Sequence, residues 1–468
     1  MGEKRRLLDR IVADCLGLEV HTTLSEPQAV PGEQVKLHRV ATVHSSASVR
    51  WHGTELKPGD PAAYDETWTV PRNQPISQPY WLREDGTPGM FQVDDPTLIG
   101  RPQGPPVLNL EDRFLVGGQT LAVTEENGPR LEVIPPVYLR LGSPVQLFAP
   151  SKSHTVRVMV SGSRAGASGT IQLEAPPGWK VTPAVQPFHL DDAGSSAALT
   201  FSVTAPSHPE SARLTARALV GGQSFSNKRI EINYKHIPRL LLQPPARIQA
   251  VCLDLAIAGH RVGYLPGAGD STVASLKQMG YEVKTLSTAD LTPAGLHGLD
   301  AVVVGVRAFN VRTDLAANLP ALWAYVNDGG TVVEQYNTPK GLQCSLGPWN
   351  ISLSSDLPAH RVTDEKSAVT LLAPDHPAFH TPNAITAADF DGWVQERGLD
   401  FPSEWDSQHL TALLACSDHG EAPLKSGLLV GKYGNGYFVY TGLSFFRQLP
   451  AGVPGAYRLF ANLVSLGK

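Results

Sequence analysis

The stretch Asp300-Ala301-Val302-Val303-Val304-Gly305 decides the fold of the C-terminal half of the chain. Such an uninterrupted apolar run predicts a parallel strand that is covered on both faces. Further strands are predicted at residues 261–266, 282–286 and 331–335, and apolar residues at helical spacing lie among them. This alternation of strand and helix predicts a doubly wound α/β domain with a parallel sheet over residues 244–468.

Residues 136–243 show a different pattern. Val156, Val158 and Val160 alternate with polar residues, and further alternating runs follow up to Ile230 and Ile232. About seven short strands in roughly 100 residues are typical of an immunoglobulin-like β-sandwich. The boundary with the next domain is placed at Pro244-Pro245, where strands of period two give way to the strand–helix alternation.

The N-terminal part also predicts short strands. Alternating or β-branched residues at 35–43, 67–70 and 107–110 favour another β-sandwich over residues 19–135, which ends at Pro135-Pro136. Residues 1–18 are predicted to be a helical linker, because apolar residues recur at helical spacing up to Gly17. The fold class is therefore multidomain, with two sandwiches followed by one α/β domain.

The composition excludes several classes of function. The 468 residues carry 39 Lys+Arg against 44 Asp+Glu, a net charge of −5, so no global field attracts nucleic acid. No run of about 18 apolar residues occurs, so no membrane span is expected. The four cysteines lie far apart, and neither a CxxC pair nor an HExxH sequence is present, so we expect no metal site and no cofactor. The chain has no signal-peptide core near its start, and the compartment stays open.

Polar residues follow the predicted parallel strands, where each strand ends. Asp270 follows the first strand, Arg307 and Asn310 follow the third, and Gln335 and Asn337 follow the fourth. Ligands of open α/β sheets bind at this edge, because the carboxyl ends of parallel strands meet there.

A second polar group comes later in the sequence. The segment around Trp393, Glu396 and Arg397 combines acids, an arginine and an aromatic ring, and Arg447 follows the last predicted hairpin. We expect the residues of both groups to form one ligand-binding cleft at the sheet edge, and a buried salt-bridge network that fixes loops is the structural alternative.

No residue is assigned a catalytic role. A nucleophile elbow of the form G-x-S-x-G or G-x-C-x-G is absent. Five aromatic residues would suit stacking on a sugar, although core packing explains such residues equally well: Trp51, Trp68, Tyr80, Trp81 and Trp179.

Four segments resemble a known family: residues 305–310, 335–339, 392–398 and 441–452. They read Gly-Val-Arg-Ala-Phe-Asn, Gln-Tyr-Asn-Thr-Pro, Gly-Trp-Val-Gln-Glu-Arg-Gly and Thr-Gly-Leu-Ser-Phe-Phe-Arg-Gln-Leu-Pro-Ala-Gly. They are similar to the C-terminal region of long bacterial PIG-L (LmbE-type) deacetylases. In that family a zinc-dependent N-acetyl-sugar deacetylase domain precedes a helical linker, β-sandwich modules and a class I glutamine amidotransferase-like (ThuA-like) domain. The resemblance covers essentially the whole chain and suggests an exported bacterial parent protein.

The chain differs from this family in the residues that carry out catalysis. The zinc domain is missing from the sequence, and Tyr336-Asn337 stands where the amidotransferase cysteine is expected. Neither an amide nor an unactivated phenol replaces a thiolate. The resemblance therefore implies a non-catalytic accessory region that binds a glycan or a small molecule. A competing hypothesis is a partner subunit that docks a separate deacetylase domain through the N-terminal helix. The alternative is a hydrolase that uses the polar sheet edge, with Glu396 or Asp270 as general base.

Overall fold

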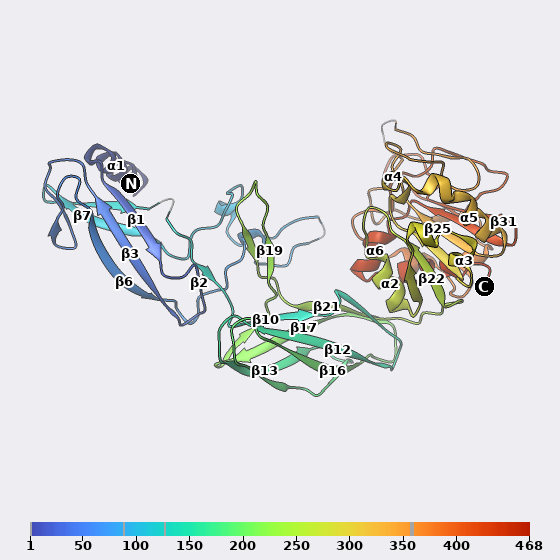
Figure 1. The fold of residues 1–468 in the computed structure, drawn as a ribbon, viewed down its shortest axis with the longest axis horizontal. Helices are drawn as coiled ribbons and strands as arrows, with labels where there is room; N and C mark the ends of the chain where they lie inside the picture. Colours follow the sequence, from blue (N-terminus) through green and yellow to red (C-terminus); the bar gives the residue numbers. More distant parts are fainter. Residues whose placement is uncertain (1, 88, 126–127, 356–359) are drawn as a thin grey trace.

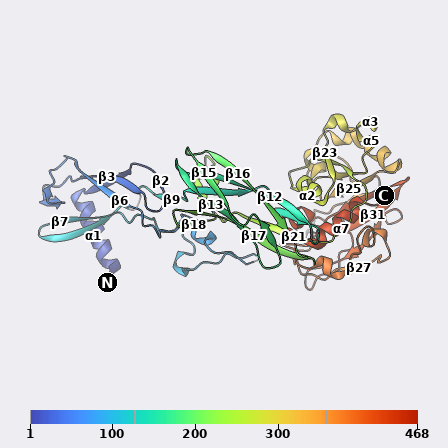
Figure 2. The same cartoon turned by 90° about the horizontal axis from the view of Figure 1, so that it is seen from below.

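The structure is a computed structural model that describes residues 2–87, 89–125, 128–355 and 360–468. Within these residues it contains seven α-helices, and most of the regular structure is β-sheet. Figures 1 and 2 show the sheets gathered into units that follow one another along the long axis, with the N-terminus at one end and the C-terminal unit at the other. The chain is thus a multidomain, β-rich protein with sandwich-like sheets.

The first unit pairs two small antiparallel sheets under helix α1 (Gly2–Leu16). One sheet has the order β1 (Glu19–Leu24), β3 (Gln34–Thr42), β6 (Ala62–Thr69). The other has the order β5 (Thr54–Glu55), β4 (Val49–Trp51), β7 (Glu111–Val116), β8 (Gln119–Thr124). Ala13 and Leu16 of α1 pack into the same cluster as Trp51 and Phe114, so the helix closes this core. A short parallel pair, β2 (Gln28–Ala29) with β9 (Glu132–Val133), lies near its exit.

Residues 107–110 differ from the sequence prediction, because they form no strand. Leu108 and Leu110 are buried, as the alternation indicated, but the ladder with β8 begins only at Glu111. An extended loop lying on a core produces the same alternation of burial as a paired strand, since both have side chains on opposite sides. Two 3₁₀ turns, η1 (Tyr80–Leu82) and η2 (Pro96–Leu98), interrupt the long connection before β7.

The middle unit consists of two sheets that share one hydrophobic core. The first sheet has the order β10 (Val137–Leu141), β12 (Ser153–Gly162), β16 (Ser196–Thr204), β14 (Lys180–Thr182). The second has the order β11 (Val145–Phe148), β21 (Arg247–Cys252), β17 (Glu210–Val220), β13 (Ala167–Glu174), β15 (Gln186–Leu190), with β18 (Gln223–Phe225) beside β17. A separate hairpin, β19 (Ile230–Ile232) with β20 (Leu240–Leu242), projects from this unit (Figure 1).

Strand β21 corrects the domain boundary that the sequence suggested. The boundary at 243/244 assigns residues 247–252 to the last domain, yet β21 pairs parallel with β11 and antiparallel with β17. Ile248 and Ala250 are buried in the sandwich core, whereas Val251 belongs to the core of the last unit. Pro244-Pro245 lies in a turn before this strand. The boundary placed at these prolines therefore precedes the last strand of the middle unit.

The last unit contains a seven-stranded sheet. Its order is β23 (Glu282–Thr285), β22 (Arg261–Leu265), β24 (Ala301–Val304), β25 (Thr331–Gln335), β32 (Gly436–Thr441), β31 (Leu428–Tyr433), β29 (Thr411–Ala412). The strands from β23 to β32 pair parallel, and β31 and β29 pair antiparallel. Two short antiparallel pairs lie outside it: β26 (Ile351–Ser352) with β28 (Glu404–Trp405), and β27 (Thr370–Leu371) with β30 (Leu414–Ala415).

Helices cover both faces of this sheet. Val303 and Val333 face a core that includes α2 (Thr272–Met279) and α7 (Pro454–Val464). Val302 and Val332 face the opposite core, with α3 (Pro293–Leu296) and α5 (Leu315–Asn327). The all-apolar run at 301–304 is explained by this double coverage, because every position in it is buried. The remaining helices are α4 (Ala308–Val311) and α6 (Phe445–Ala451), and the 3₁₀ turns are η3 (Thr288–Asp290), η4 (Pro377–Phe379) and η5 (Ala387–Phe390).

The β31–β32 hairpin turns at Gly434 and Asn435. Tyr433 pairs with Gly436, so Gly436 is already part of the ladder. A Cβ at Gly436 would lie 2.0 Å from the carbonyl oxygen of Gly330, so the glycine is needed for close backbone approach rather than for the turn.

Candidate functional site

Residues at the ends of three neighbouring parallel strands meet in what we call the edge cluster: Arg307, Tyr336, Glu396, Asp400, Phe446 and Arg447. Arg307 follows β24, Tyr336 follows β25, and Phe446 and Arg447 belong to α6, which follows β32. Glu396 and Asp400 come from a long connection between η5 and β28. The cluster therefore forms because consecutive parallel strands deliver their following residues to one edge of the sheet.

Glu396 and Arg447 form an ion pair in this cluster. Arg447 donates from Nε to Oε1 of Glu396 over 2.5 Å, and its guanidinium carbon lies 4.8 Å from the ring centre of Phe446. The Tyr336 and Phe446 rings lie 5.1 Å apart, inclined by 35°. The charged pair is thus placed beside two aromatic rings.

Arg307 and Asp400 add a second pair of opposite charges. Burial raises the pKa of Asp400, the Arg307 guanidinium opposes this rise, and the Glu396 carboxylate adds to it. Burial also raises the pKa of Tyr336, which faces the charges of all four residues. The Nε of Arg307 is buried and has no hydrogen-bond partner within the described residues.

Backbone strain occurs in the edge cluster and directly beside it. Arg307, Gln395 and Asp400 adopt positive φ angles of 56°, 67° and 45°. Non-glycine residues in the left-handed region cost about 1–3 kcal/mol each and concentrate at functional sites. Arg307 is held there by a backbone hydrogen bond of 2.8 Å from its amide to the carbonyl of Tyr336.

Asp270 and Asn310 lie at the same sheet edge but serve the loops. Asp270 accepts from the amides of Thr272 and Val306, at 2.8 and 3.1 Å, and so ties the loop after β22 to the loop after β24. Asn310 donates to the carbonyl of Thr338 and accepts from its amide. Both side chains therefore hold backbone groups of these loops together.

Gln335 and Asn337 are buried inside the sheet edge. Asn337 accepts from the amide of Phe309 at 3.0 Å and donates to Glu334 at 3.0 Å. Gln335 donates to the carbonyl of Val304, and its Oε1 has no hydrogen-bond partner among the residues described. These two candidates are therefore beneath the edge cluster rather than part of it.

Trp393 and Arg397 hold the connection that carries Glu396. Arg397 donates twice to the carbonyl of Ser367 and once to that of Phe390, and its guanidinium lies over the Trp393 ring at 5.5 Å. Burial lowers the pKa of Arg397. Both residues position the backbone, which agrees with the structural alternative for this part of the predicted cleft.

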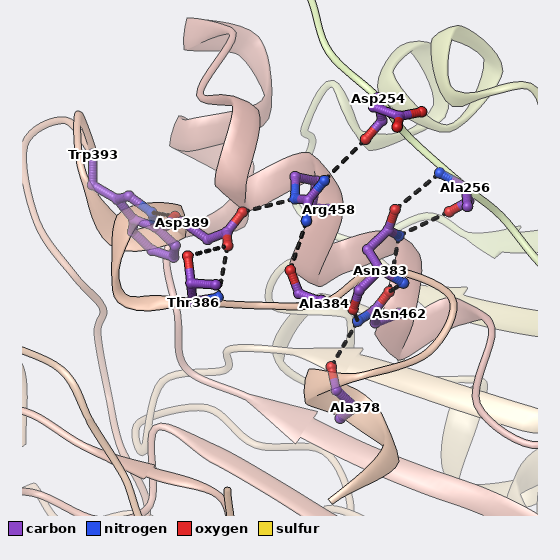
Figure 3. A network of polar contacts seen from close by, with 10 residues as sticks. All are labelled: Asp254, Ala256, Ala378, Asn383, Ala384, Thr386, Asp389, Trp393, Arg458 and Asn462. Carbon is purple, nitrogen blue, oxygen red and sulfur yellow. Dashed lines mark hydrogen bonds and ion pairs between the residues drawn. The ribbon is translucent and has the colours of Figure 1, made fainter. Parts of the chain in front are cut away.

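Figure 3 shows how the same connection is attached to α7. Trp393 donates from its ring nitrogen to the carbonyl of Asp389, and Asp389 forms an ion pair with Arg458 at 2.9 Å. One turn further along the helix, the side-chain oxygen of Asn462 accepts from the backbone and side-chain amides of Asn383, and its nitrogen donates to the carbonyl of Asn383. Helix α7 thus serves as the support on which this connection is fixed.

The predicted candidates therefore divide into two sets. Arg307, Glu396 and Arg447 come together in the edge cluster, and the other candidates brace it or lie beneath it. Asp400 and Phe446 are not among the candidates predicted from the sequence, where Tyr336 is named only as the residue at the expected cysteine position. The residue type of Asp400 is compatible with its backbone, because aspartate tolerates the left-handed conformation better than most residues. This preference does not reveal that Asp400 lies near Arg307.

Three of the five aromatic residues considered for sugar stacking are core residues. Trp51, Tyr80 and Trp179 are buried, and Trp51 donates to the buried carboxylate of Asp112 at 3.2 Å. Trp68 and Trp81 are partly exposed. The core explanation therefore holds for the three buried residues.

In the part of the chain that the structure describes, no group of three or more His, Cys, Asp or Glu side chains is placed to hold a metal ion. No described helix combines the length and the apolar character that a membrane crossing requires.

No family model matches the chain, and no curated protein matches it. Among solved structures it is similar to a Salmonella alpha-2-macroglobulin at 12% identity and a TM-score of 0.20, over 50% of this chain and 16% of that one. A cohesin–dockerin complex from Clostridium thermocellum matches 25% of this chain and 99% of the other, at 8% identity and a TM-score of 0.15. A family 123 glycoside hydrolase from Clostridium perfringens matches 43% of this chain and 38% of its own, at 8% identity and a TM-score of 0.16. This chain spans only a small part of the alpha-2-macroglobulin, and at such scores these likenesses carry no statement about function.

Proposed function

We propose that this chain is a non-catalytic accessory region of the PIG-L deacetylase type, and that its edge cluster binds a neutral, polyhydroxylated ligand such as a sugar. The observation that carries the proposal is the composition of the cluster. Two guanidinium groups, two carboxyl groups and two aromatic rings lie together at the edge of one sheet.

The charges of the cluster favour a neutral ligand. Arg307 and Arg447 balance Glu396 and Asp400, so the site offers no net attraction to an anion or a cation. Guanidinium groups donate hydrogen bonds and carboxylates accept them, which together match hydroxyl groups that do both. The rings of Tyr336 and Phe446 supply the apolar surface on which the carbon face of a sugar ring packs.

Binding is favoured over catalysis because the cluster offers no activated nucleophile. Burial raises the pKa of the Tyr336 hydroxyl, and burial raises the pKa of Cys344 to about 11 and of Cys416 to about 12. Thiols and phenols with raised pKa values stay protonated at neutral pH and are poor nucleophiles. Arg447 compensates the charge of Glu396, so this carboxylate serves better as a hydrogen-bond acceptor than as a general base.

We also propose specific fold types for the last and the middle unit. We interpret the last unit as a doubly wound, amidotransferase-like α/β domain, supported by its run of parallel strands and by helices packed on both faces. We interpret the middle unit as immunoglobulin-like, supported by two sheets around one core. The separate deacetylase domain would dock on α1, where Leu7, Leu8 and Ile11 are exposed.

The test is calorimetric titration of the full chain with N-acetylglucosamine oligosaccharides. We expect binding to the unaltered protein, and its loss in Glu396→Gln and in Arg447→Ala at unchanged melting temperature. Arg361→Ala is the matched control, because Arg361 is likewise paired with acidic residues on this unit but lies outside the edge cluster. Loss of stability without a change in binding would mean that the cluster is a structural network.

Asp400 supports the hydrolase alternative. Its pKa is raised by burial beside Glu396, and a carboxyl group with a raised pKa can act as a general acid. A screen of the chain on N-acetylated sugars and simple esters separates the two functions. Turnover that is lost in Asp400→Asn would favour the hydrolase.

A further inference from the structure

A cavity of about 480 Å³ lies in the middle unit, far from the edge cluster in sequence. One wall is strand β10 with the loop that follows it, and the facing wall is the segment 228–230 together with Ala246 and Arg247. Leu139, Leu141 and Ile230 give the cavity an apolar lining beside its polar groups.

Four basic side chains line the cavity, and two of them are paired with acidic residues outside its lining. Arg140, Lys228, Arg229 and Arg247 line it, and its lining contains neither aspartate nor glutamate, although the whole chain has a net charge of −5. Arg229 is paired with Glu231 at 2.6 Å, and Arg247 is paired with Asp85 at 2.7 and 2.8 Å. The side chains of Arg140 and Lys228 make no hydrogen bond or ion pair within the described residues, and the Nε of Arg247 is buried without a hydrogen-bond partner among them. The basic side chains of Arg140 and Lys228 are therefore available to bind an acidic ligand in the cavity.

Strand β10 is the first strand of its sheet, so one of its edges has no neighbouring strand in that sheet. The amide of Leu139 donates to the carbonyl of Asn227 at 2.8 Å, which brings the segment 226–228 to this edge. After that point the chain leaves β10 to form the β19–β20 hairpin, which projects from the unit in Figure 1. The edge beyond Leu139 therefore faces the cavity.

We propose that this cavity receives an extended, acidic peptide segment of a partner protein, which adds to β10 as a further strand. An open strand edge binds a peptide through main-chain hydrogen bonds, and neighbouring side chains select its sequence. Alternate residues of an extended peptide point to the same side, so glutamates at every second position can reach the cationic lining together. The basic side chains and the edge of β10 together favour an acidic peptide. An isolated anion would pair with the basic side chains but would make no main-chain hydrogen bonds with β10.

The experiment measures the fluorescence anisotropy of a labelled short peptide of alternating threonine and glutamate on the full chain. The control peptide has the same charges but carries proline in place of threonine, which removes backbone donors. We expect the proline peptide to bind at least about tenfold more weakly. Hydrogen exchange should also slow at Leu141 when the threonine–glutamate peptide is added, since the amide of Leu139 already donates to Asn227.

The variant Arg140→Ala/Lys228→Ala should abolish binding of the peptide. Lys180→Ala is the matched control, because Lys180 lies exposed on β14, the strand at the opposite end of the same sheet order. Equal binding of the two peptides, tighter binding of a sulfated tetrasaccharide, or competition by inorganic phosphate at the same concentration would overturn the strand-addition proposal. Absence of binding at millimolar peptide, or equal losses in both variants, would overturn it as well. The sugar titrations of the edge cluster give an independent result.

Discussion

Asn337 donates its side-chain amide to Oε1 of Glu334 over 3.0 Å, and both residues are fully buried under the edge cluster. Oε2 of Glu334 has no hydrogen-bond partner in the described part of the chain. Burial raises the pKa of Glu334 well above its ordinary value. The carboxyl group therefore keeps its proton in the folded protein at a pH where the unfolded chain would lose it.

This raised pKa makes the stability of the last unit dependent on pH. The folded state binds more protons than the unfolded state between the ordinary pKa of glutamate and the raised pKa of Glu334. The contribution of Glu334 is fully present below its ordinary pKa and is lost as the pH rises. We expect Glu334→Gln, which mimics the protonated form, to stabilise the protein by about 1–3 kcal/mol near pH 8 and by much less near pH 5. Denaturant unfolding at both pH values measures this, with the exposed Glu404→Gln as control. A gain of the same size at both pH values would contradict it.

Arg397 and Arg447 should differ sharply in their effects on stability. Arg397→Ala removes three buried hydrogen bonds and leaves the carbonyls of Ser367 and Phe390 without partners, so we expect a loss of about 2–4 kcal/mol. Arg447 has a side chain that is 37% exposed, so water can replace it, and Arg447→Ala should cost about 1 kcal/mol or less. Thermal unfolding of the two variants side by side provides the comparison. Equal losses would show that the ion pair with Glu396 is structural.

Asn462 should be essential for the support shown in Figure 3. Its side chain makes hydrogen bonds with Ala378 and Asn383 while fully buried. Asn462→Leu leaves those backbone groups unsatisfied, and we expect it to lower the free energy of unfolding by about 2–4 kcal/mol and to speed proteolysis within residues 376–393. Leu463→Met, on the next position of α7, should cost less than about 1.5 kcal/mol. Similar losses in both variants would mean that general packing, not the amide bonds, holds this connection.

The four cysteines should differ in reactivity toward a thiol reagent. Cys15 is exposed on α1, whereas Cys252 and Cys416 are buried and Cys344 is partly buried. Burial raises the pKa of Cys252, of Cys344 to about 11 and of Cys416 to about 12, so their thiolate fractions near pH 8 are very small. We expect one fast-reacting thiol in the native protein, which is lost in Cys15→Ser, and all four thiols after unfolding. A second fast thiol in the native state would identify a mobile region near Cys344.

The strands of the last unit could be located from the sequence because their physical signals are local. Residues 301–304 and 331–335 are buried at every position, and the first of these strands stands out in the sequence as an apolar run. The limits of β21 could not be found in the same way. This strand belongs to its sheet through pairing with β11 and β17, which are distant in sequence, and prolines before it resemble a domain boundary.

Part of the site could be predicted for a topological reason and part could not. Arg307 and Arg447 follow strands, so their convergence is a consequence of parallel pairing. Asp400 lies in a connection of irregular structure, and its position depends on contacts such as that of Arg397 with Ser367. Sequence patterns also do not reveal that Gln335 and Asn337 point into the core, since both are polar residues at strand ends.

Strands β11 and β21 contribute to two cores at once. Phe148, Ile248 and Ala250 belong to the sandwich core, and Val145 and Val251 belong to the core of the last unit. Gln278 of α2 adds a link, because its Oε1 accepts from the amide of Leu147 and from Gln146. Unfolding either unit would expose apolar surface of the other, so the two should melt together as one cooperative block. A calorimetric scan should therefore resolve at most one separate transition, that of the N-terminal unit. A protein cut at residue 244 should lose β21 from the sandwich. The edges of β11 and β17 would then be exposed and prone to aggregation.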